Sequence, residues 1–344
     1  MIEKTLFGKV GGQDIFLFRI SGRSGYSFTA MNYGATLTEI LCPDREGKPV
    51  CVICGYDKLE DYQKASGYQG ATIGRFANRI GKAEFDLNQK HYALFRNDGN
   101  NHLHGGAKGF DKQVWSWVLS DGDEPYVEFS RVSPDGEEGY PGELELTVRM
   151  TLKADRILSI SYLAVSDKDT PFNFTNHAYF NLNGPGSGPI TSHELSLDAD
   201  RYLPVNSELI PTGGIAPVSG TPFDFRMAKT IGQDIDLTGT GYDHCMVFED
   251  RGPGVFRRAT LYSPQSGIGL HLSTDLPSVQ LYSGNMMDDP TPFRGGVPQI
   301  PREAVCLETE LMPDSMHHEG FTDCILKAGC TFSSTTQYEF FVRK

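Results

Sequence analysis

Long apolar runs and an excess of basic residues are both absent from this sequence. A membrane-spanning helix needs about 20 predominantly apolar residues, and no stretch of the 344-residue chain approaches that length. The 31 lysines and arginines are outnumbered by 44 aspartates and glutamates, which gives a formal net charge of −13. Phosphate backbones and anionic lipid surfaces attract basic faces, so we expect neither a nucleic acid nor a membrane as partner.

A regular cysteine framework is also missing. The seven cysteines are odd in number and irregularly spaced, which argues against disulfides. Residues 1–4 lack the basic and apolar regions of a secretory signal, and we expect a cytoplasmic location. Cys51 and Cys54 have C-x-x-C spacing, but strand alternation would direct them to opposite faces, so small buried side chains are favoured over a zinc or redox site. His317 and His318 lie in a polar segment, where solvated histidines are commoner than metal ligands.

Helical patterns are scarce, and a period of two dominates. Only residues 59–65 could form two helical turns. Apolar and polar residues alternate almost strictly over 143–152 and again over 158–164, which predicts a hairpin of half-buried strands. The 38 glycines and 20 prolines supply the turns that such a fold requires. Further turns of hairpins are predicted at residues 10–13, 44–47 and 263–267, with a last strand at 338–342.

The pattern as a whole predicts an all-β protein, a large antiparallel β-sandwich whose loops and strand ends carry the function. Neither a βαβ alternation nor an internal repeat is present. The Gly/Pro-rich residues 183–189 are interpreted as a flexible connector, but strands of one style flank it, so we expect a single domain over residues 1–344. No dinucleotide fingerprint, Walker-type loop or G-x-S-x-G nucleophile elbow occurs, which disfavours those function classes.

Two polar segments in the first third of the chain are candidates for a site. Arg75, Asn78 and Arg79 combine an amide with two guanidinium groups, either as donors for ligand hydroxyls or as surface residues of a strand. His102 and His104 are two residues apart, so in a strand they would share a face, and the glycines that follow allow close approach of the backbone. Sugar contact, acid/base catalysis, a metal pair and a structural role all remain open for these histidines.

Three further positions bear a carboxylate or an imidazole. His177 lies among polar and aromatic residues in segment 175–182, where it lines either a wet cleft or a hydrogen-bonded core site, because an unpaired buried histidine is costly. Asp243 lies beside an imidazole in a turn-like segment, and a plain turn aspartate is the alternative. Glu308 ends an apolar run. A carboxylate base with an imidazole acid could open and reclose a sugar ring.

Taken together, these segments resemble the aldose 1-epimerases, the galactose mutarotases. The resemblance implies a galactose-mutarotase-like supersandwich of antiparallel strands with the sugar in an open cleft, and it implies neither a cofactor nor a metal. It implies a small-molecule sugar as partner and a monomer or homodimer. The matching stretches follow the family order over nearly the whole chain: 74–80, 103–106 with 109–112, 133–142, 175–182, 241–244, 279–285 and 306–314.

By position, the resemblance implies an isomerase that interconverts the α and β anomers of free hexoses, galactose and glucose, through ring opening and reclosure. Glu308 matches the general base and His177 the general acid. His104 rather than His102 matches the histidine that contacts the sugar. The substrate-binding residues implied by the resemblance are Asn78, Arg79, His104, Tyr179, Asp243 and Gln280.

Some details depend on the groups around this pair. For His177 to act as an acid near neutral pH, we expect neighbouring carboxylates such as Asp243 to raise its pKa. The family often has Gln two residues after the base, whereas this chain has Glu310. Alternation would direct Glu310 to the face of Glu308, where it either raises the pKa of the base or pairs with a cation. Tyr179 is a candidate to stack on the sugar; Trp115 and Trp117 are better explained as core residues.

Other functions are compatible with parts of this pattern. A hexose 6-phosphate epimerase of the same fold would need additional basic residues, and Arg75 and Arg79 are the evident basic pair in the matching segments. A glycoside hydrolase could use Asp243 and Glu308 as its two carboxyl groups. A non-catalytic sugar-binding protein would have no need of both Glu308 and His177.

Overall fold

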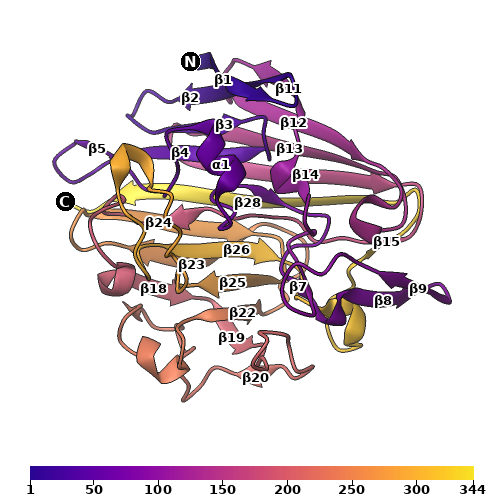
Figure 1. Ribbon diagram of the computed structural model, residues 1–344. Helices are drawn as coiled ribbons and strands as arrows, with labels where there is room; N and C mark the ends of the chain where they lie inside the picture. Colours follow the sequence, from indigo (N-terminus) through magenta and orange to yellow (C-terminus); the bar gives the residue numbers. More distant parts are fainter.

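The computed structural model describes residues 1–344, and almost all of its regular structure is antiparallel strand (Figure 1). The largest sheet has nine strands, and β28, drawn in yellow, lies at its middle. Its strands in spatial order are β11 (Ser116–Ser120), β12 (Tyr126–Ser133), β13 (Leu144–Lys153), β14 (Ile157–Ser166), β28 (Thr331–Val342), β24 (Ile268–Thr274), β23 (Phe256–Tyr262), β18 (Glu194–Leu197) and β21 (Lys229–Thr230).

Two smaller sheets pack against this one. The five-stranded sheet contains β1 (Ile2–Val10), β2 (Gln13–Ser21), β3 (Ser27–Met31), β4 (Thr36–Pro43) and β5 (Pro49–Cys51). The six-stranded sheet contains β17 (Tyr179–Phe180), β26 (Val305–Glu310), β25 (Ser278–Tyr282), β22 (Asp243–Phe248), β19 (Ala199–Tyr202) and β20 (Ala216–Pro217).

Four short strand pairs and a few single turns of helix complete the fold. The pairs are β7 (Arg79–Ile80) with β10 (His102–Leu103), β6 (Thr72–Ile73) with β16 (Thr175–Asn176), β15 (Thr170–Pro171) with β27 (Ile325–Leu326), and β8 (Glu84–Leu87) with β9 (Lys90–Ala93). The α-helix is α1 (Leu59–Lys64), and 3-10 turns occur at Gly81–Ala83, Phe110–Lys112, Glu137–Gly139, Ile190–Ser192, Ile235–Thr238, Arg294–Gly296 and Ser315–His317. None of these helices has the length and apolar character needed to cross a membrane.

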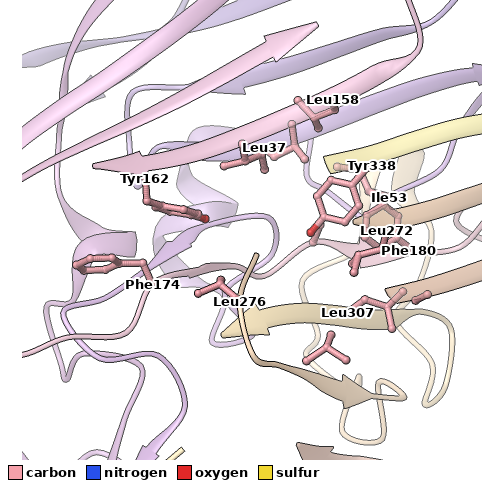
Figure 2. Packing of buried hydrophobic residues seen from close by; sticks show 14 of the residues in the cluster. Leu37, Ile53, Leu158, Tyr162, Phe174, Phe180, Leu272, Leu276, Leu307 and Tyr338 are labelled. Atoms are coloured by element: carbon pink, nitrogen blue, oxygen red, sulfur yellow. The ribbon is translucent and has the colours of Figure 1, made fainter. Parts of the chain in front are cut away.

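The core lies between the nine-stranded sheet and the two smaller sheets. The ring centroids of Phe18 on β2 and Phe129 on β12 are 5.8 Å apart, and those of Phe180 on β17 and Tyr338 on β28 are 5.3 Å apart. Figure 2 shows part of this core, where Leu307 of β26 lies near Phe180. One continuous cluster of 61 buried residues connects all three sheets, so the expected all-β sandwich is confirmed.

The predicted hairpin of residues 143–164 is confirmed as β13 and β14. The alternate residues of β13 from Leu144 to Leu152 are buried, because one face of the strand packs on the core. The predicted turns at 10–13, 44–47 and 263–267 and the helix near 59–65 are confirmed as well.

Residues 183–189, expected to be a flexible connector, form a loop with several hydrogen bonds to neighbouring segments. The Asn181 amide donates to the carbonyls of Gly188 and Glu303, and the backbone N–H of Gly186 donates to the Glu303 carboxylate. Ser263 donates to the Asn183 side chain. These bonds hold the loop against the body of the protein, although its glycines and prolines suggest mobility.

Candidate active site

A cavity of about 310 Å³ opens over one face of the six-stranded sheet. All eight residues that the sequence predicts for the site line it: Asn78, Arg79, His104, His177, Tyr179, Asp243, Gln280 and Glu308. They come from six separate stretches of the chain, and the fold brings them together. The other lining residues are Ser66, Gly67, Tyr68, Leu103, Tyr282, Met286 and Asp288.

The floor of the cavity is formed by β22, β25 and β26. Gln280 and Glu308 are opposite each other in the ladder between β25 and β26, so both side chains leave the sheet on the same face. Asp243 lies on β22, the next strand, and the Gln280 amide donates to its Oδ1 at 2.6 Å. The pairing of three neighbouring strands therefore sets the relative positions of these polar groups.

The segment that precedes β7 forms one wall. Asn78 has a positive φ of 64°, and its backbone N–H donates to Nδ1 of His104 at 3.1 Å. The side-chain oxygen of Asn78 accepts the N–H of Arg79 at 2.8 Å. Asn173 ties this segment to the end of β26, because its amide donates to the carbonyls of Ala77 and Leu311.

The expectation that His102 and His104 share a strand face is wrong. β10 ends at Leu103, and His104 has a positive φ of 52°, which turns its ring into the cavity. His102 is fully buried elsewhere, with Nδ1 2.7 Å from the Phe95 carbonyl and Nε2 2.8 Å from the Tyr140 hydroxyl. His102 is therefore a hydrogen-bonded core histidine.

His104 is a neutral hydrogen-bond donor. Because its Nδ1 accepts the Asn78 N–H, its proton resides on Nε2. Burial, reinforced by His177 and Arg79, lowers the pKa of His104 well below the usual value. The polar ligand atoms of His104, His177 and Glu308 lie within 4.8 Å of one another. Since Nε2 of His104 keeps its proton, we do not interpret this trio as metal ligands.

His177 lies between two tyrosine rings and faces Glu308. Its ring stacks on Tyr179 with centroids 4.9 Å apart and on Tyr68 at 6.0 Å. Nε2 of His177 is 3.6 Å from Oε2 of Glu308, and Nδ1 is 3.5 Å from the sulfur of Cys306. Both side chains of the pair are nearly inaccessible, with 6% and 3% exposure.

Burial sets the protonation of this pair. Desolvation lowers the pKa of His177 to about 4, and it raises the pKa of Glu308 well above the usual range, with a smaller contribution from Asp243. The expectation that neighbouring carboxylates keep His177 charged near neutral pH is therefore wrong for the structure as it stands. Burial therefore favours a neutral imidazole beside a neutral carboxylic acid over an ion pair of the two.

Of the two predicted guanidinium groups, only Arg79 reaches the cavity. Its Nε is 2.8 Å from Asp98 and its Nη1 is 3.9 Å from Asp243. Arg75 is buried, and its guanidinium donates to the carbonyls of Ser133, Pro141 and Gly142. Arg75 does not line the cavity and is not at the surface, so neither of the two interpretations left open for it, ligand donor or surface residue, is correct.

The aromatic lining consists of Tyr68, Tyr179 and Tyr282. Trp115 packs on Phe110 in the core, as the sequence suggests. Tyr282 falls in the matching stretch 279–285, so its position was within reach of sequence reasoning. Tyr68, Met286 and Asp288 lie on loops, and no periodicity or spacing in the sequence points to them.

The structure also places Glu310 and the adjacent histidines His317 and His318. Glu310 shares the face of Glu308, as alternation predicts, and its Oε1 accepts the Asn78 amide at 3.2 Å. It forms no ion pair, so the alternative of a cation partner is wrong. His317 and His318 lie outside the cavity, at 2.6 and 3.2 Å from the buried Asp314; His317 is exposed, as expected for a solvated histidine, whereas His318 is partly buried.

Known proteins resemble this chain over nearly its whole length. A family model for aldose 1-epimerase matches residues 17–339. Galactose mutarotase of Bos taurus is 42% identical over 314 residues, which cover 91% of this chain and 90% of that protein. Aldose 1-epimerase of Escherichia coli (strain K12) is 38% identical over 347 residues, with 99% of both chains covered.

Solved structures agree with these matches. Galactose 1-epimerase from Lactobacillus acidophilus NCFM has a TM-score of 0.87 at 30% identity, over 100% of this chain and 99% of that one. An aldose epimerase homologue from C. elegans has a TM-score of 0.89 at 28% identity, over 95% and 99%. The expected galactose-mutarotase-like fold is thereby confirmed. The chain belongs to the aldose 1-epimerase family, and it is an isomerase that interconverts the anomers of hexoses.

Proposed function

We propose that the cavity converts the α and β anomers of free galactose and glucose into one another, with Glu308 as general base and His177 as general acid. The observation that carries this proposal is the 3.6 Å separation of the two groups at the floor of a cavity lined by hydrogen-bonding side chains. The names of the relatives support galactose as a substrate.

Ring opening needs one proton removed and one added. Glu308 takes the proton of the C1 hydroxyl, the C1–O5 bond breaks, and O5 takes the proton from Nε2 of His177. The product is the open-chain aldehyde, with Glu308 protonated and His177 neutral. Rotation about C1–C2 presents the other face of the carbonyl, and the same two transfers in reverse close the ring.

The neutral imidazole and protonated carboxyl group that burial favours are the state of His177 and Glu308 after ring opening. Before ring opening, the proton on Glu308 must therefore move to His177, a transfer within the 3.6 Å pair. A bound sugar favours that transfer, because its C1 hydroxyl donates to the Glu308 carboxylate and its ring oxygen accepts from the imidazolium. The pair holds one proton throughout, so turnover requires no exchange with solvent.

The remaining predicted residues orient the sugar. The His104 Nε2–H and the guanidinium of Arg79 donate to hydroxyl or ring oxygens, while Asp243 accepts from hydroxyls. Gln280 and Asn78 hold these groups through the hydrogen bonds given above. Tyr68, Tyr179 and Tyr282 supply apolar ring faces for the C–H face of the sugar.

The charge of the cavity favours a free sugar over a sugar phosphate. Asp243 and Asp288 line it, and Arg79 is the only lysine or arginine among the lining residues. Arg79 is already engaged by Asp98 and Asp243. A phosphate group would enter a site that offers no unpaired cation, which is unfavourable.

Polarimetry tests the proposal directly. Fresh α-D-galactose and α-D-glucose are followed with wild-type protein, with Glu308→Gln and with His177→Asn, beside glucose 6-phosphate. We expect catalysed decay of rotation for the free sugars, a large loss in both variants, and little catalysis with the phosphate. Full activity of Glu308→Gln would contradict the role of the base, and release of free sugar from an aryl glycoside would favour a glycosidase.

We also propose that residues 1–344 form one domain that works in the cytoplasm as a monomer or homodimer, without nucleic acid or membrane as partner. The single core cluster across the three sheets supports one domain, and seven free cysteines suit a reducing compartment. Sedimentation of the purified protein and cell fractionation test these points.

A further inference from the structure

Glu310 is a carboxyl group in the interior of the protein with no charged partner. Its exposure is 0%, and it belongs to none of the protein's ion pairs. Oε1 accepts one hydrogen bond, from the Asn78 amide, and Oε2 has no partner. An ionised carboxylate in such a place would lose its hydration without compensation, whereas a neutral acid loses far less.

The groups that face Glu310 make ionisation still less favourable. Glu308 lies on the same strand, Asp243 and Cys245 on β22, and Arg79 on β7. The single cation among them, Arg79, is engaged by Asp98 and Asp243. Burial first, and then Glu308, raise the pKa of Glu310 well above its usual value.

The one side-chain hydrogen-bond partner of Glu310 is Asn78, which makes three hydrogen bonds within the site. Asn78 donates its amide to Glu310, accepts the Arg79 N–H at its side-chain oxygen, and donates its backbone N–H to His104. The amide can make the first two bonds together only in one orientation. Asn78 also has a positive φ of 64°, a conformation in which asparagine is enriched over most other residues.

We propose that Glu310 is a positioning residue that acts as a neutral carboxylic acid, whose Oε1 holds the Asn78 amide and thereby fixes Arg79 and the Nε2–H donor of His104. It touches neither the sugar nor the reacting atoms. The inference rests on the sugar-binding roles proposed above for Asn78, Arg79 and His104.

Three substitutions separate positioning from packing. Glu310→Gln keeps a carbonyl oxygen for Asn78 and cannot ionise, and Glu310→Met keeps the volume without a strong acceptor. Thr309→Ser changes a buried residue on the other face of β26 and serves as the control. We expect kcat/KM for galactose to fall about tenfold in Glu310→Met, mainly through KM, as for one lost orienting hydrogen bond, and Glu310→Gln to recover most of it.

Equal activity of Glu310→Met and wild type would overturn the positioning role. A loss that Glu310→Gln fails to recover would show that the acid proton or its charge is needed, and would also overturn it.

Thermal unfolding between pH 5 and 9 tests the neutral form without any activity measurement. Above the pKa of an unfolded glutamate, the unfolded wild type releases a proton that the folded state keeps, so its stability falls as pH rises. Glu310→Gln has no such proton. We therefore expect its midpoint temperature to exceed that of wild type by a margin that grows with pH.

A margin that stays constant over this range would mean that Glu310 is already ionised in the fold, and the inference would be wrong. This readout also separates the two proposals. If Glu308→Gln were fully active, the proposed catalytic roles would fail while the stability result could still hold.

Discussion

Charged side chains lie in opposite environments in two strands of this protein, exposed in β13 and buried in β26. In β13 every second residue faces the core and is apolar, while Glu145 and Arg149 face water. Arg149 lies 2.6 Å from Glu128 of the neighbouring strand at the surface. All six residues of β26 are buried, and two of them are glutamates without a lysine or arginine partner.

The difference arises from what covers each face. One face of β13 is open to solvent, so an ionised side chain there keeps its hydration. Both faces of β26 are covered, one by the core and the other by the walls of the cavity, so the glutamates of β26 hold their protons more tightly than usual. Desolvation thus shifts the pKa of Glu308 in the direction that suits acid–base chemistry, while the same effect favours the neutral form of Glu310.

The largest expected difference between the strands is catalytic. Glu308→Gln on β26 should lower kcat for galactose mutarotation by roughly 10²–10⁴-fold, because the amide cannot accept the C1 hydroxyl proton. Glu145→Gln on β13 is the matched control and should leave kcat unchanged. Polarimetry of both variants at pH 7 measures the contrast, and similar rates for the two would remove it.

The next largest effect is expected on stability rather than on catalysis, and in β13 rather than in β26. Leu146→Ala on the buried face of β13 should lower the free energy of unfolding by about 2–5 kcal/mol, through lost burial and the cavity left behind. The kcat of the folded variant should stay near that of wild type, since Leu146 is remote from the cavity lining. Urea denaturation with a parallel rate assay checks both; a large drop in kcat without loss of stability would contradict the separation of core from site.

The kcat/KM of the enzyme should depend on pH through the buried pair of His177 and Glu308. Because the pKa of His177 is lowered to about 4, the pair holds one proton from that pH up to the raised pKa of Glu308. Below about pH 4 a second proton binds and no base remains, so kcat/KM should fall about tenfold per pH unit.

The same lowered pKa also bears on stability. An unfolded histidine titrates near 6.5, so the contribution of His177 to stability is complete above that value and declines as pH falls toward 4. Rates measured after brief exposure to low pH and return to pH 7 distinguish titration from unfolding. An acid limb near pH 6.5 would show that His177 titrates as an ordinary histidine.

The smallest effect is expected at the surface pair of β13. Arg149→Gln removes the partner of Glu128, but the Arg149 and Glu128 side chains are 47% and 22% exposed, and such pairs contribute about 0–1 kcal/mol. The midpoint of urea unfolding should hardly move at moderate salt. A destabilisation comparable to that of Leu146→Ala would mean that charge on the open face matters more than its exposure indicates.

Much of the fold could be predicted from the sequence, for a reason that β13 illustrates. Alternation is a local property, and a strand with one open face displays it in full. β26 has no comparable alternation of exposed and buried residues, because both of its faces are buried and the face toward the cavity bears glutamates. The candidate residues there came from the resemblance of whole segments to a family.

The sequence could not decide which of two similar neighbouring residues reaches the cavity. Arg75 and Arg79 are four apart, and only the carbonyls of a distant loop, which accept from the Arg75 guanidinium, hold Arg75 in the core. His102 and His104 differ because the chain takes a positive φ at the second. Tyr68 and Met286 reach the cavity from loops whose paths no local pattern determines.

The sequence by itself determined the strand pattern, the order of the family segments and the identity of the eight residues that line one cavity. The tertiary structure alone decided how these residues hold their protons. Desolvation is a sum over all neighbouring atoms, and the neighbours of Glu308, Glu310 and His177 come from strands and loops far apart in the chain. That sum lowers the pKa of His177 and raises the pKa values of Glu308 and Glu310, which favours the neutral form of all three groups.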